Sequence, residues 1–156
     1  KEPGLRLTRE GLKWTKEGNN MVVTAEYEMR KLEATLVMKY ILTADGQLIV
    51  NQSLKAGENK EGKPQLFRFG MQMVMPEAYA NIEYYGKGPG ENYIDRNNDE
   101  TIGVYTQKVA DQYFPYIRPQ ESGNKTEVRY WRVLDNAGKG LEFFGTEALN
   151  ATALNY

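Results

Sequence analysis

The chain has 156 residues, of which 40% are hydrophobic and 26% are charged, and its 20 Lys and Arg residues nearly balance its 21 Asp and Glu residues, for a net charge of −1. This composition excludes a disordered chain, and the balanced charge excludes the basic surface with which proteins bind nucleic acids or anionic membranes. The absence of cysteine and histidine excludes disulfides, thiolate metal sites and catalysis by a histidine base. We therefore expect neither nucleic acid nor a membrane as a partner.

At this length we expect one domain over residues 1–156. The chain starts at Lys1 with no signal sequence ahead of its first apolar pattern. Its last residues read as the start of another ordered element. We therefore expect a fragment that is truncated at both ends.

The first part of the chain alternates between apolar and polar residues, which is typical of β-strands. Residues 5–14 predict one broken strand or two short strands around a polar turn. Residues 21–29 and 34–43 each predict one strand. The Asp-Gly pair at residues 45–46 separates the second of these from residues 48–50 and predicts a tight hairpin.

The alternation returns at residues 65–75, with Phe at positions 67 and 69 and Met at positions 71, 73 and 75. We expect a strand here whose Phe and Met side chains face a core. A methionine-lined binding surface is the alternative. Residues 81–85 predict a further short strand that leads into a loop.

The last predicted strands are residues 127–134 and, after a turn at residues 135–138, residues 140–145. Residues 109–112 predict one helical turn, and we expect no long helix. Strands at short intervals with turns between them indicate an all-β fold, an antiparallel sandwich or barrel.

Between residues 85 and 131 glycine, proline and aromatic residues are concentrated. Glycine and proline fix an irregular backbone, and the polar side chains among them hydrogen-bond a loop to itself or to a partner. We assign a candidate structural motif to two blocks of this stretch and assign no substrate-binding residue. The motif residues are Gly86, Gly88, Pro89, Glu91, Asn92, Tyr93, Asp95, Arg96, Pro119, Gln120, Glu121, Gly123, Asn124, Arg129 and Trp131.

The glycine-rich segment at residues 86–90 does not fit a nucleotide-binding loop. Glu91 stands where a dinucleotide-binding loop requires glycine. The Gly-Lys-Ser/Thr ending of a phosphate-binding loop is missing as well. We therefore prefer a structural turn.

A second motif has oxygen-bearing side chains at alternate positions, as the start of a calcium loop does. The sixth position should be glycine and is Glu100, and the twelfth should be glutamate and is Thr106. We therefore prefer a polar turn and assign no metal ligands. The alternating residues are Asp95, Asn97 and Asp99.

Four acidic residues of this stretch could supply the pair of carboxylates that cleaves a glycosidic bond. They lie near Arg96, Lys125 and Arg129, and carboxylates in such surroundings are more often ion-paired scaffolding, which we prefer. The many tyrosines suit either a sugar-binding face or a half-buried sheet surface, and composition leaves both interpretations open. The four acids are Glu91, Asp95, Glu121 and Glu127.

Residues 86–96 read Gly-Lys-Gly-Pro-Gly-Glu-Asn-Tyr-Ile-Asp-Arg, and residues 115–131 read Pro-Tyr-Ile-Arg-Pro-Gln-Glu-Ser-Gly-Asn-Lys-Thr-Glu-Val-Arg-Tyr-Trp. The first block resembles the segment Gly-x-Gly-Pro-x-Glu-Asn-Tyr-x-Asp-Arg of the large bacterial β-galactosidases of glycoside hydrolase family 2. The second resembles their segment Pro-Tyr-x-x-Pro-Gln-Glu-x-Gly-Asn-Arg-Thr-Asp-Val-Arg-Trp. The two blocks have the order and the separation of that family, and outside them the similarity is one of strand pattern.

This resemblance implies the carboxy-terminal, small-chain domain of a retaining enzyme that hydrolyses terminal β-galactosides. The implied fold is a large antiparallel β-sandwich, a supersandwich similar to galactose mutarotase. The catalytic glutamates of the family lie on a separate (β/α) barrel, so the resemblance makes no residue of this chain catalytic, and we expect the chain alone to be inactive.

The resemblance also implies no cofactor in this chain, because the Mg and Na ions that the family often uses are bound elsewhere. The implied partners are the remaining domains of the parent β-galactosidase and, through that parent, a carbohydrate substrate. A bacterial protein of the cytoplasm or the periplasm is implied, without a choice between the two.

We predict that the two blocks pack together, with Arg96 or Arg129 meeting Glu91, Glu121 or Glu127, and that they hold one face of the domain against the barrel. A galactoside-binding module that acts alone is the alternative function. An aldose epimerase is disfavoured, because that chemistry in the related family uses histidine and the chain has none.

Overall fold

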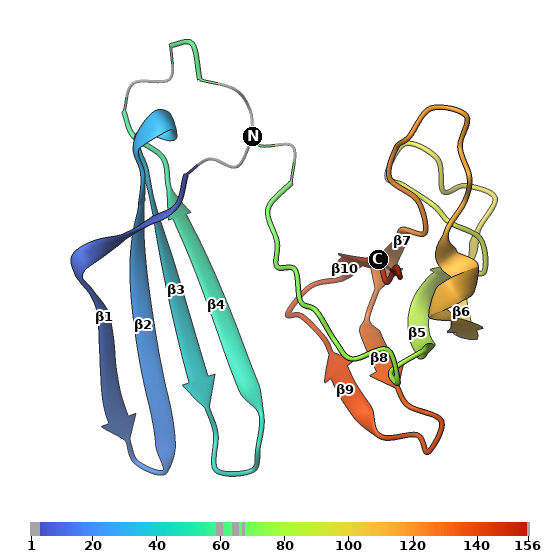
Figure 1. Ribbon diagram of the computed structural model, residues 1–156, viewed down its shortest axis with the longest axis horizontal. Helices are drawn as coiled ribbons and strands as arrows, with labels where there is room; N and C mark the ends of the chain where they lie inside the picture. The colour runs from blue at the N-terminus through green and yellow to red at the C-terminus, as the bar shows by residue number, and fades with distance from the viewer. Residues whose placement is uncertain (1–3, 59–60, 64–65, 67, 156) are drawn as a thin grey trace. The chain divides into compact units, whose positions relative to one another are not determined.

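The computed structural model describes residues 4–58, 61–63, 66 and 68–155. The chain consists of two compact units, Lys1–Gly70 and Met71–Tyr156 (Figure 1). Strands dominate the described residues of both units, and the two short helices found there are single 3-10 turns. The predicted single domain over residues 1–156 stays a prediction, and the two units are described separately.

The first unit is one antiparallel sheet with the strand order β1-β2-β3-β4. Its strands are β1 (Arg6–Glu17), β2 (Asn20–Met29), β3 (Ala34–Leu42) and β4 (Leu48–Lys55), and the 3-10 turn η1 (Arg30–Leu32) joins β2 to β3. The strands predicted at residues 21–29 and 34–43 and the hairpin after them are therefore confirmed. Each strand pairs with its neighbour in the sequence, which is why the local pattern was sufficient to locate them.

Strand β1 contains an irregularity where a broken strand was predicted. Its pairing with β2 shifts register between Leu7 and Leu12. Gly11 lies at this shift, and a Cβ atom there would lie 2.5 Å from the backbone oxygen of Glu26. The missing side chain lets the two backbones approach, so the strand continues through a bulge instead of ending.

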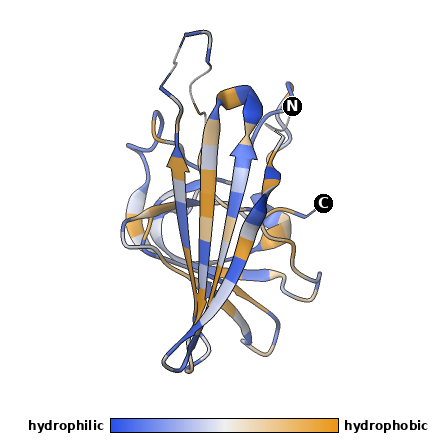
Figure 2. Ribbon diagram, turned by 90° about the vertical axis from the view of Figure 1, so that its left-hand side faces the viewer, coloured by the Kyte–Doolittle hydropathy of each residue, from blue (hydrophilic) through white to orange (hydrophobic). Residues whose placement is uncertain are grey.

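One face of this sheet is apolar across all four strands. Paired residues share a face, and the register places Trp14, Val23, Tyr40 and Val50 in one row. Figure 2 shows apolar and polar residues alternating along these strands. Trp14 is 71% exposed, so the apolar face remains open to solvent at the β1 edge.

The second unit has a four-stranded antiparallel sheet in the order β6-β5-β8-β9 and a separate pair, β10-β7. The turn η2 (Val109–Gln112) follows β6, as the sequence predicted for these residues. The strands are β5 (Asn81–Gly88), β6 (Thr101–Lys108), β7 (Lys125–Val128), β8 (Tyr130–Leu134), β9 (Gly140–Phe143) and β10 (Leu149–Ala151).

Aromatic rings make up the centre of the second unit. Tyr84 is fully buried, and its ring centroid lies 5.4 Å from that of Tyr105 and 5.2 Å from that of Trp131. Burial of large rings contributes most of the apolar stabilisation in a core of this size. The buried cluster consists of Ile82, Tyr84, Val109, Val128, Trp131 and Val133.

The strand predicted at residues 65–75 is wrong for the described residues of that range. Residues 66 and 68–75 lie outside every strand. Phe69 is 52% exposed and Met71 55% exposed, so they do not face a core, whereas Met75 packs against the core of the second unit as expected. Alternation defines a strand only where a neighbouring strand accepts its hydrogen bonds, and no described strand pairs with this segment. Residues 65 and 67 lie outside the described residues.

The strand predicted at residues 127–134 is two strands that belong to different sheets. Glu127 has a φ of +53°, a left-handed conformation that is uncommon for residues other than glycine. The backbone N–H of Arg129 then donates to the carbonyl of Tyr85 at 2.7 Å, at the point where the chain passes from β7 to β8. Strand β6 was not predicted, because its half-buried positions are Gly103, Tyr105 and Gln107 and its aliphatic residues are exposed.

The described residues are all-β with antiparallel sheets, which confirms the predicted fold class and is consistent with a β-sandwich. Neither of the two short helical turns in the described residues has the length or the apolar character to cross a membrane.

Candidate functional site

The two blocks singled out in the sequence meet at Asn92. Its side chain is completely buried in the loop that follows β5. The backbone N–H of Asn92 donates to the carbonyl of Asn124 at 2.8 Å, and Nδ2 of Asn124 donates to the carbonyl of Asn92 at 2.7 Å. The prediction that the blocks pack together is confirmed.

The side-chain amide of Asn92 uses its full hydrogen-bonding capacity. Its Nδ2 donates to the carbonyls of Lys87 and Gly90, each at 3.0 Å. Its Oδ1 accepts from the backbone N–H of Thr126 at 2.9 Å and from the Thr126 hydroxyl at 2.6 Å. This arrangement joins the end of β5, the loop and the start of β7 through one side chain.

At two positions of the motif another segment of the backbone lies so close that only glycine fits. Gly86 packs on β7, where an added Cβ would lie 3.0 Å from Cα of Val128. Gly123 has a φ of +77°, and its Cβ would lie 2.7 Å from the carbonyl oxygen of Gln112. Both positions therefore exclude larger side chains for a structural reason.

The turn preferred from the sequence is found only in part, because residues 86–88 end strand β5 and the bend is limited to Pro89 and Gly90. A Cβ atom on Gly88 would overlap the Tyr84 hydroxyl, and the Gly88–Pro89 peptide bond is cis. The backbone N–H of Gly90 donates to Oε2 of Glu100 at 3.1 Å.

Arg96 joins the first block to its surroundings. Its Nη2 atom lies 3.4 Å from Oε1 of Glu91 and 3.1 Å from the hydroxyl of Tyr116. Its guanidinium carbon lies 4.4 Å above the ring centroid of Tyr93, in cation–π geometry. The other carboxylate oxygen of Glu91 accepts the backbone N–H of Gly123 at 2.8 Å, so this carboxylate holds both blocks.

A second ion-pair group surrounds Glu127. Its carboxylate lies 3.6 Å from Arg129 and 3.5 Å from Lys87. The predicted pairs Arg96–Glu91 and Arg129–Glu127 are therefore confirmed. The contacts of Glu91 and Glu127 are those of ion-paired scaffolding.

The other motif residues are dispersed. Asp95, Pro119 and Gln120 are exposed, and Glu121 is half-buried. Trp131 is a core residue and does not offer its ring to a ligand.

A crevice lies against the second block, and the sequence analysis did not predict it. Its volume is about 220 Å³. Its lining residues are Pro89, Gly90, Glu91, Gln107, Asp111, Gln112, Tyr113, Phe114 and Lys125.

Lys125 is the buried charged group of this crevice and is 2% exposed. Its Nζ donates to Oε1 of Gln112 at 2.9 Å and lies 6.0 Å from the ring centroid of Tyr84. Burial lowers the pKa of Lys125, while the charges of Glu91 and Glu100 partly oppose that effect. Residues 122–126 form a continuous buried run in the structure. The sequence shows only that this run is mostly polar, and burial cannot be read from that, so the sequence holds no signal for this site.

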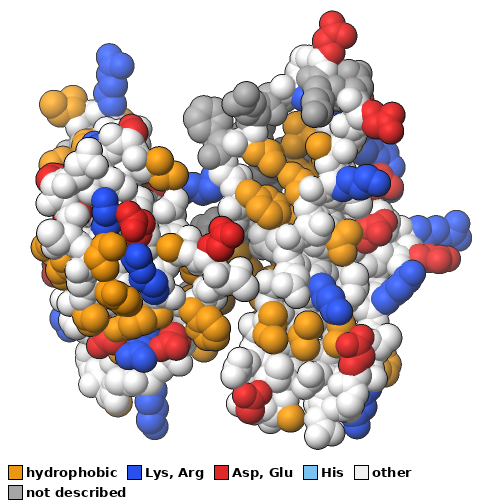
Figure 3. Space-filling view, turned by 180° about the vertical axis from the view of Figure 1, so that it is seen from behind, with side chains coloured by type: hydrophobic (Ala, Val, Ile, Leu, Met, Phe, Trp, Pro, Cys, Tyr) orange, Lys and Arg blue, Asp and Glu red, His pale blue; other side chains and the backbone are white. Residues whose placement is uncertain are grey.

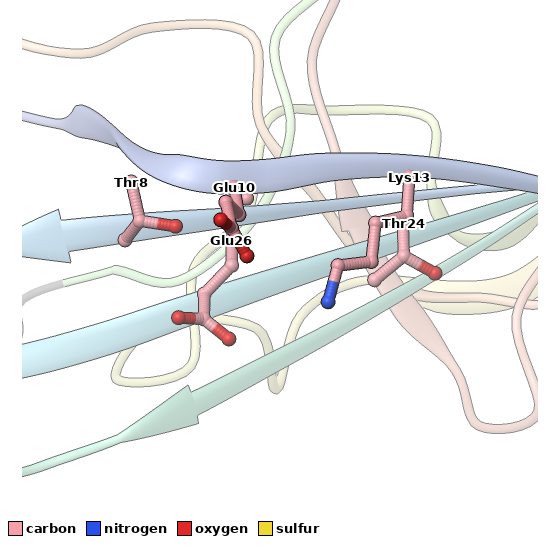
Figure 4. Close-up of a pocket in the computed structure, with 6 residues that line it drawn as sticks. Thr8, Glu10, Lys13, Thr24 and Glu26 are labelled. Atoms are coloured by element: carbon pink, nitrogen blue, oxygen red, sulfur yellow. The ribbon is translucent and has the colours of Figure 1, made fainter.

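A second hollow of about 210 Å³ lies on β1 and β2 at the bulge (Figure 4). Its side chains are Thr8, Glu10, Lys13, Thr24 and Glu26, around the backbone of Gly11. The three charged side chains are all exposed, so the hollow lacks a buried polar group that would hold a ligand.

Asn97, one of the alternating oxygen-bearing residues, is engaged by side chains of the neighbouring segments. Asn97 accepts Nζ of Lys87 with its backbone oxygen at 2.9 Å and with Oδ1 at 3.2 Å, and its Nδ2 donates to Thr126 at 3.2 Å. Within the ranges that the structure describes, no group of three or more Asp or Glu side chains is arranged to hold a metal ion.

The comparisons with known proteins agree with the resemblance of the two blocks. The model of a family described as "Beta galactosidase small chain" matches residues 4–156. A β-galactosidase of Priestia megaterium is 32% identical over 136 residues, 87% of this chain, and one of Lactobacillus delbrueckii subsp. bulgaricus is 34% identical over 142 residues, 90% of this chain. These alignments span 13% and 14% of the relatives' own lengths.

Proposed function

The chain belongs to the β-galactosidase small-chain family, and from this premise we propose that it is a non-catalytic domain of a larger retaining β-galactosidase of glycoside hydrolase family 2. In this role it shapes the rim of an active site built by other domains and stabilises their assembly. The substrates are terminal β-galactosides that reach the parent enzyme.

The observation that carries this proposal is that the side chains of the two family blocks bind one another and the neighbouring backbone. The carboxylate of Glu91 binds Arg96 and the backbone of Gly123, and every side-chain bond of Asn92 ends inside the domain. Groups that are bonded in this way orient loops, whereas a catalytic acid needs an oxygen that can reach the substrate.

The exposed apolar surface supports a role in assembly. Hydrophobic side chains lie on the surfaces of both units (Figure 3). Among them Trp14 is 71% exposed in the first unit and Phe144 is 64% exposed in the second. Large exposed hydrophobic side chains in contiguous patches mark interaction surfaces, and the relatives have several times the length of this chain to cover them.

The proposal also includes the type of β-sandwich and the location of the metal ions in the parent enzyme. We assign the sheets to a supersandwich similar to galactose mutarotase, supported by their antiparallel pairing. The Mg and Na ions of the family are assigned to other parts of the parent, and the chain's partners are those remaining domains.

The test is the hydrolysis of a chromogenic β-galactoside by three proteins: the longer protein that carries this chain, the same protein without residues 1–156, and residues 1–156 alone. We expect turnover from the longer protein and none from the other two. Turnover by residues 1–156 alone would contradict the non-catalytic role. Full turnover by the protein without them would contradict the role in shaping the active site.

Carbohydrate binding is a second candidate function. The crevice beside Lys125 favours it, because buried polar groups and exposed aromatic rings meet there.

A further inference from the structure

The crevice beside Lys125 holds hydrogen-bonding capacity that the described residues do not use. A lysine ammonium has three N–H donors, and Gln112 is the acceptor that the described residues provide for Lys125. Across the crevice, Nε2 of Gln107 donates to the carbonyl of Pro89 at 2.9 Å. Oε1 of Gln107 is buried and has no hydrogen-bond partner among the described residues. A ligand with hydroxyl groups could accept a hydrogen bond from Lys125 and donate one to Oε1 of Gln107.

The charges of the crevice lining favour a neutral ligand. Lys125 supplies one positive charge and Asp111 one negative charge, and the carboxylate of Glu91 is already paired with Arg96 at 3.4 Å. An anionic ligand would face Asp111, and a cation would face the buried ammonium. A neutral molecule with several hydroxyl groups meets the donor of Lys125 and the acceptors of Gln107 and Asp111 without such repulsion.

Two aromatic side chains complete the wall. Tyr113 is 67% exposed and Phe114 is 53% exposed, and both line the crevice directly after η2. Rings of this kind cover the C–H face of a pyranose, whose rim of hydroxyl groups then points to the polar residues. The volume of about 220 Å³ has the scale of a single ring and not of an extended chain.

We infer that this crevice binds one neutral pyranose ring, with Lys125, Gln107 and Asp111 on its hydroxyl groups and Tyr113 on its apolar face. The inference rests on the second of the two functions proposed above, carbohydrate binding, and names its site. It does not depend on the non-catalytic role of the chain in a larger enzyme.

The test is a titration of residues 1–156 with D-galactose, D-glucose and glycerol, followed by the amide NMR signals of Gly90, Gln107 and Gln112. We expect saturable shifts with at least one of the two sugars and weaker binding of glycerol, which has no ring to cover Tyr113. Absence of saturable shifts with both sugars, or equal binding of glycerol, would overturn the inference. Because no hydrolysis is measured, this result is separate from the test of the enzyme's activity.

Substitutions locate the site. Tyr113→Ala should weaken sugar binding about fivefold, because an aromatic contact is lost while the buried groups stay in place. Lys125→Met should weaken it about tenfold or more through the loss of a charged donor. Lys139→Met and Phe144→Ala change an exposed lysine and an exposed aromatic ring outside the crevice and should leave binding unchanged. Unchanged binding in a folded Tyr113→Ala variant would also overturn the inference, even if Lys125→Met fails to fold.

Discussion

Asn92 and Asn124 each bind the backbone of the other: the N–H of Asn92 donates to the carbonyl of Asn124, and the Asn124 side chain donates to the carbonyl of Asn92. Both residues are buried, although they are 32 positions apart in the chain. This reciprocal pair joins the two family blocks and makes them one structural unit.

The Asn92 side chain should dominate the stability of this unit. Asn92→Ala would leave the buried N–H of Thr126 without this acceptor and would remove the donor to the part-buried carbonyls of Lys87 and Gly90, so we expect the free energy of unfolding to fall by about 2 kcal/mol or more. Urea unfolding followed by Trp131 fluorescence in a Trp14→Phe background measures this change. Asn98→Ala, in the same loop but exposed, should change stability by less than about 0.5 kcal/mol. Equal effects of the two substitutions would contradict the assignment.

Gly123 and Gly138 offer a matched comparison, because both have a φ of +77°. An added Cβ at Gly138 has no heavy atom within 4 Å, whereas at Gly123 it lies 2.7 Å from the carbonyl oxygen of Gln112. Gly138→Ala should cost about 1 kcal/mol for the left-handed backbone alone. Gly123→Ala should cost at least about 1 kcal/mol more, and the difference in urea midpoints between the two variants isolates the contact.

Arg96 should contribute modestly to stability. Its ion pair with Glu91 is half-exposed, and its ring contact with Tyr93 is a separate contribution. We expect Arg96→Ala to lower the free energy of unfolding by about 1 kcal/mol, with part of the loss restored in Arg96→Lys, which keeps the charge but not the planar stacking. In the longer protein, turnover per folded molecule should persist in both variants. A loss of turnover with unchanged stability would count against a scaffolding role.

Tyr84 carries a buried hydroxyl that has no hydrogen-bond partner among the described residues, and burial raises the pKa of this group. Tyr84→Phe removes an unsatisfied polar atom and keeps the ring stacked on Trp131. We expect the free energy of unfolding to rise by up to about 1 kcal/mol. Tyr130→Phe is the control, because its hydroxyl donates to Glu83 at 3.3 Å and its removal should not stabilise the chain. Destabilisation by Tyr84→Phe would indicate that a water molecule or another group satisfies the hydroxyl.

The burial of Lys125 predicts a pH dependence of stability. Its pKa in the folded chain lies below the ordinary value of 10.5, so between these two values the unfolded chain binds more protons than the folded chain. The free energy of unfolding therefore increases as the pH rises from the lowered pKa to 10.5. At a pH below the lowered pKa the lysine is charged in both states, and the full cost of burying its charge remains. Lys125→Met removes this dependence. The stability of the unsubstituted chain relative to that variant should increase as the pH rises from neutral towards the ordinary lysine pKa of 10.5. A constant difference would show that the lysine titrates as it does in water.

Much of the fold could be predicted wherever strands that pair are adjacent in the sequence. Strands β2 and β3 and the hairpin into β4 follow from period-two alternation and an Asp-Gly turn, because the pairing partner is the next segment of the chain. The same alternation failed at residues 66 and 68–75, where no described strand provides a partner. Period-two patterning states which residues share a face, but not whether a second strand is present.

The arrangement of the motif residues could be predicted from the sequence only in part. Opposite charges within the first block correctly predicted the pair of Arg96 with Glu91. The burial of Asn92 and Lys125 could not be read from polar residue types, which are usually exposed. Their burial depends on partners that other segments supply, such as Thr126 for Asn92 and Gln112 for Lys125.

The sequence by itself determined the all-β class, most strand positions and, through residues 86–96 and 115–131, the β-galactosidase family. Only the tertiary structure decided that β7 leaves the sheet at Glu127, that Trp131 belongs to the core and that Lys125 lies buried beside a crevice. The reason is physical: strand periodicity is a property of neighbouring residues, whereas the burial and satisfaction of polar groups depend on contacts between distant segments.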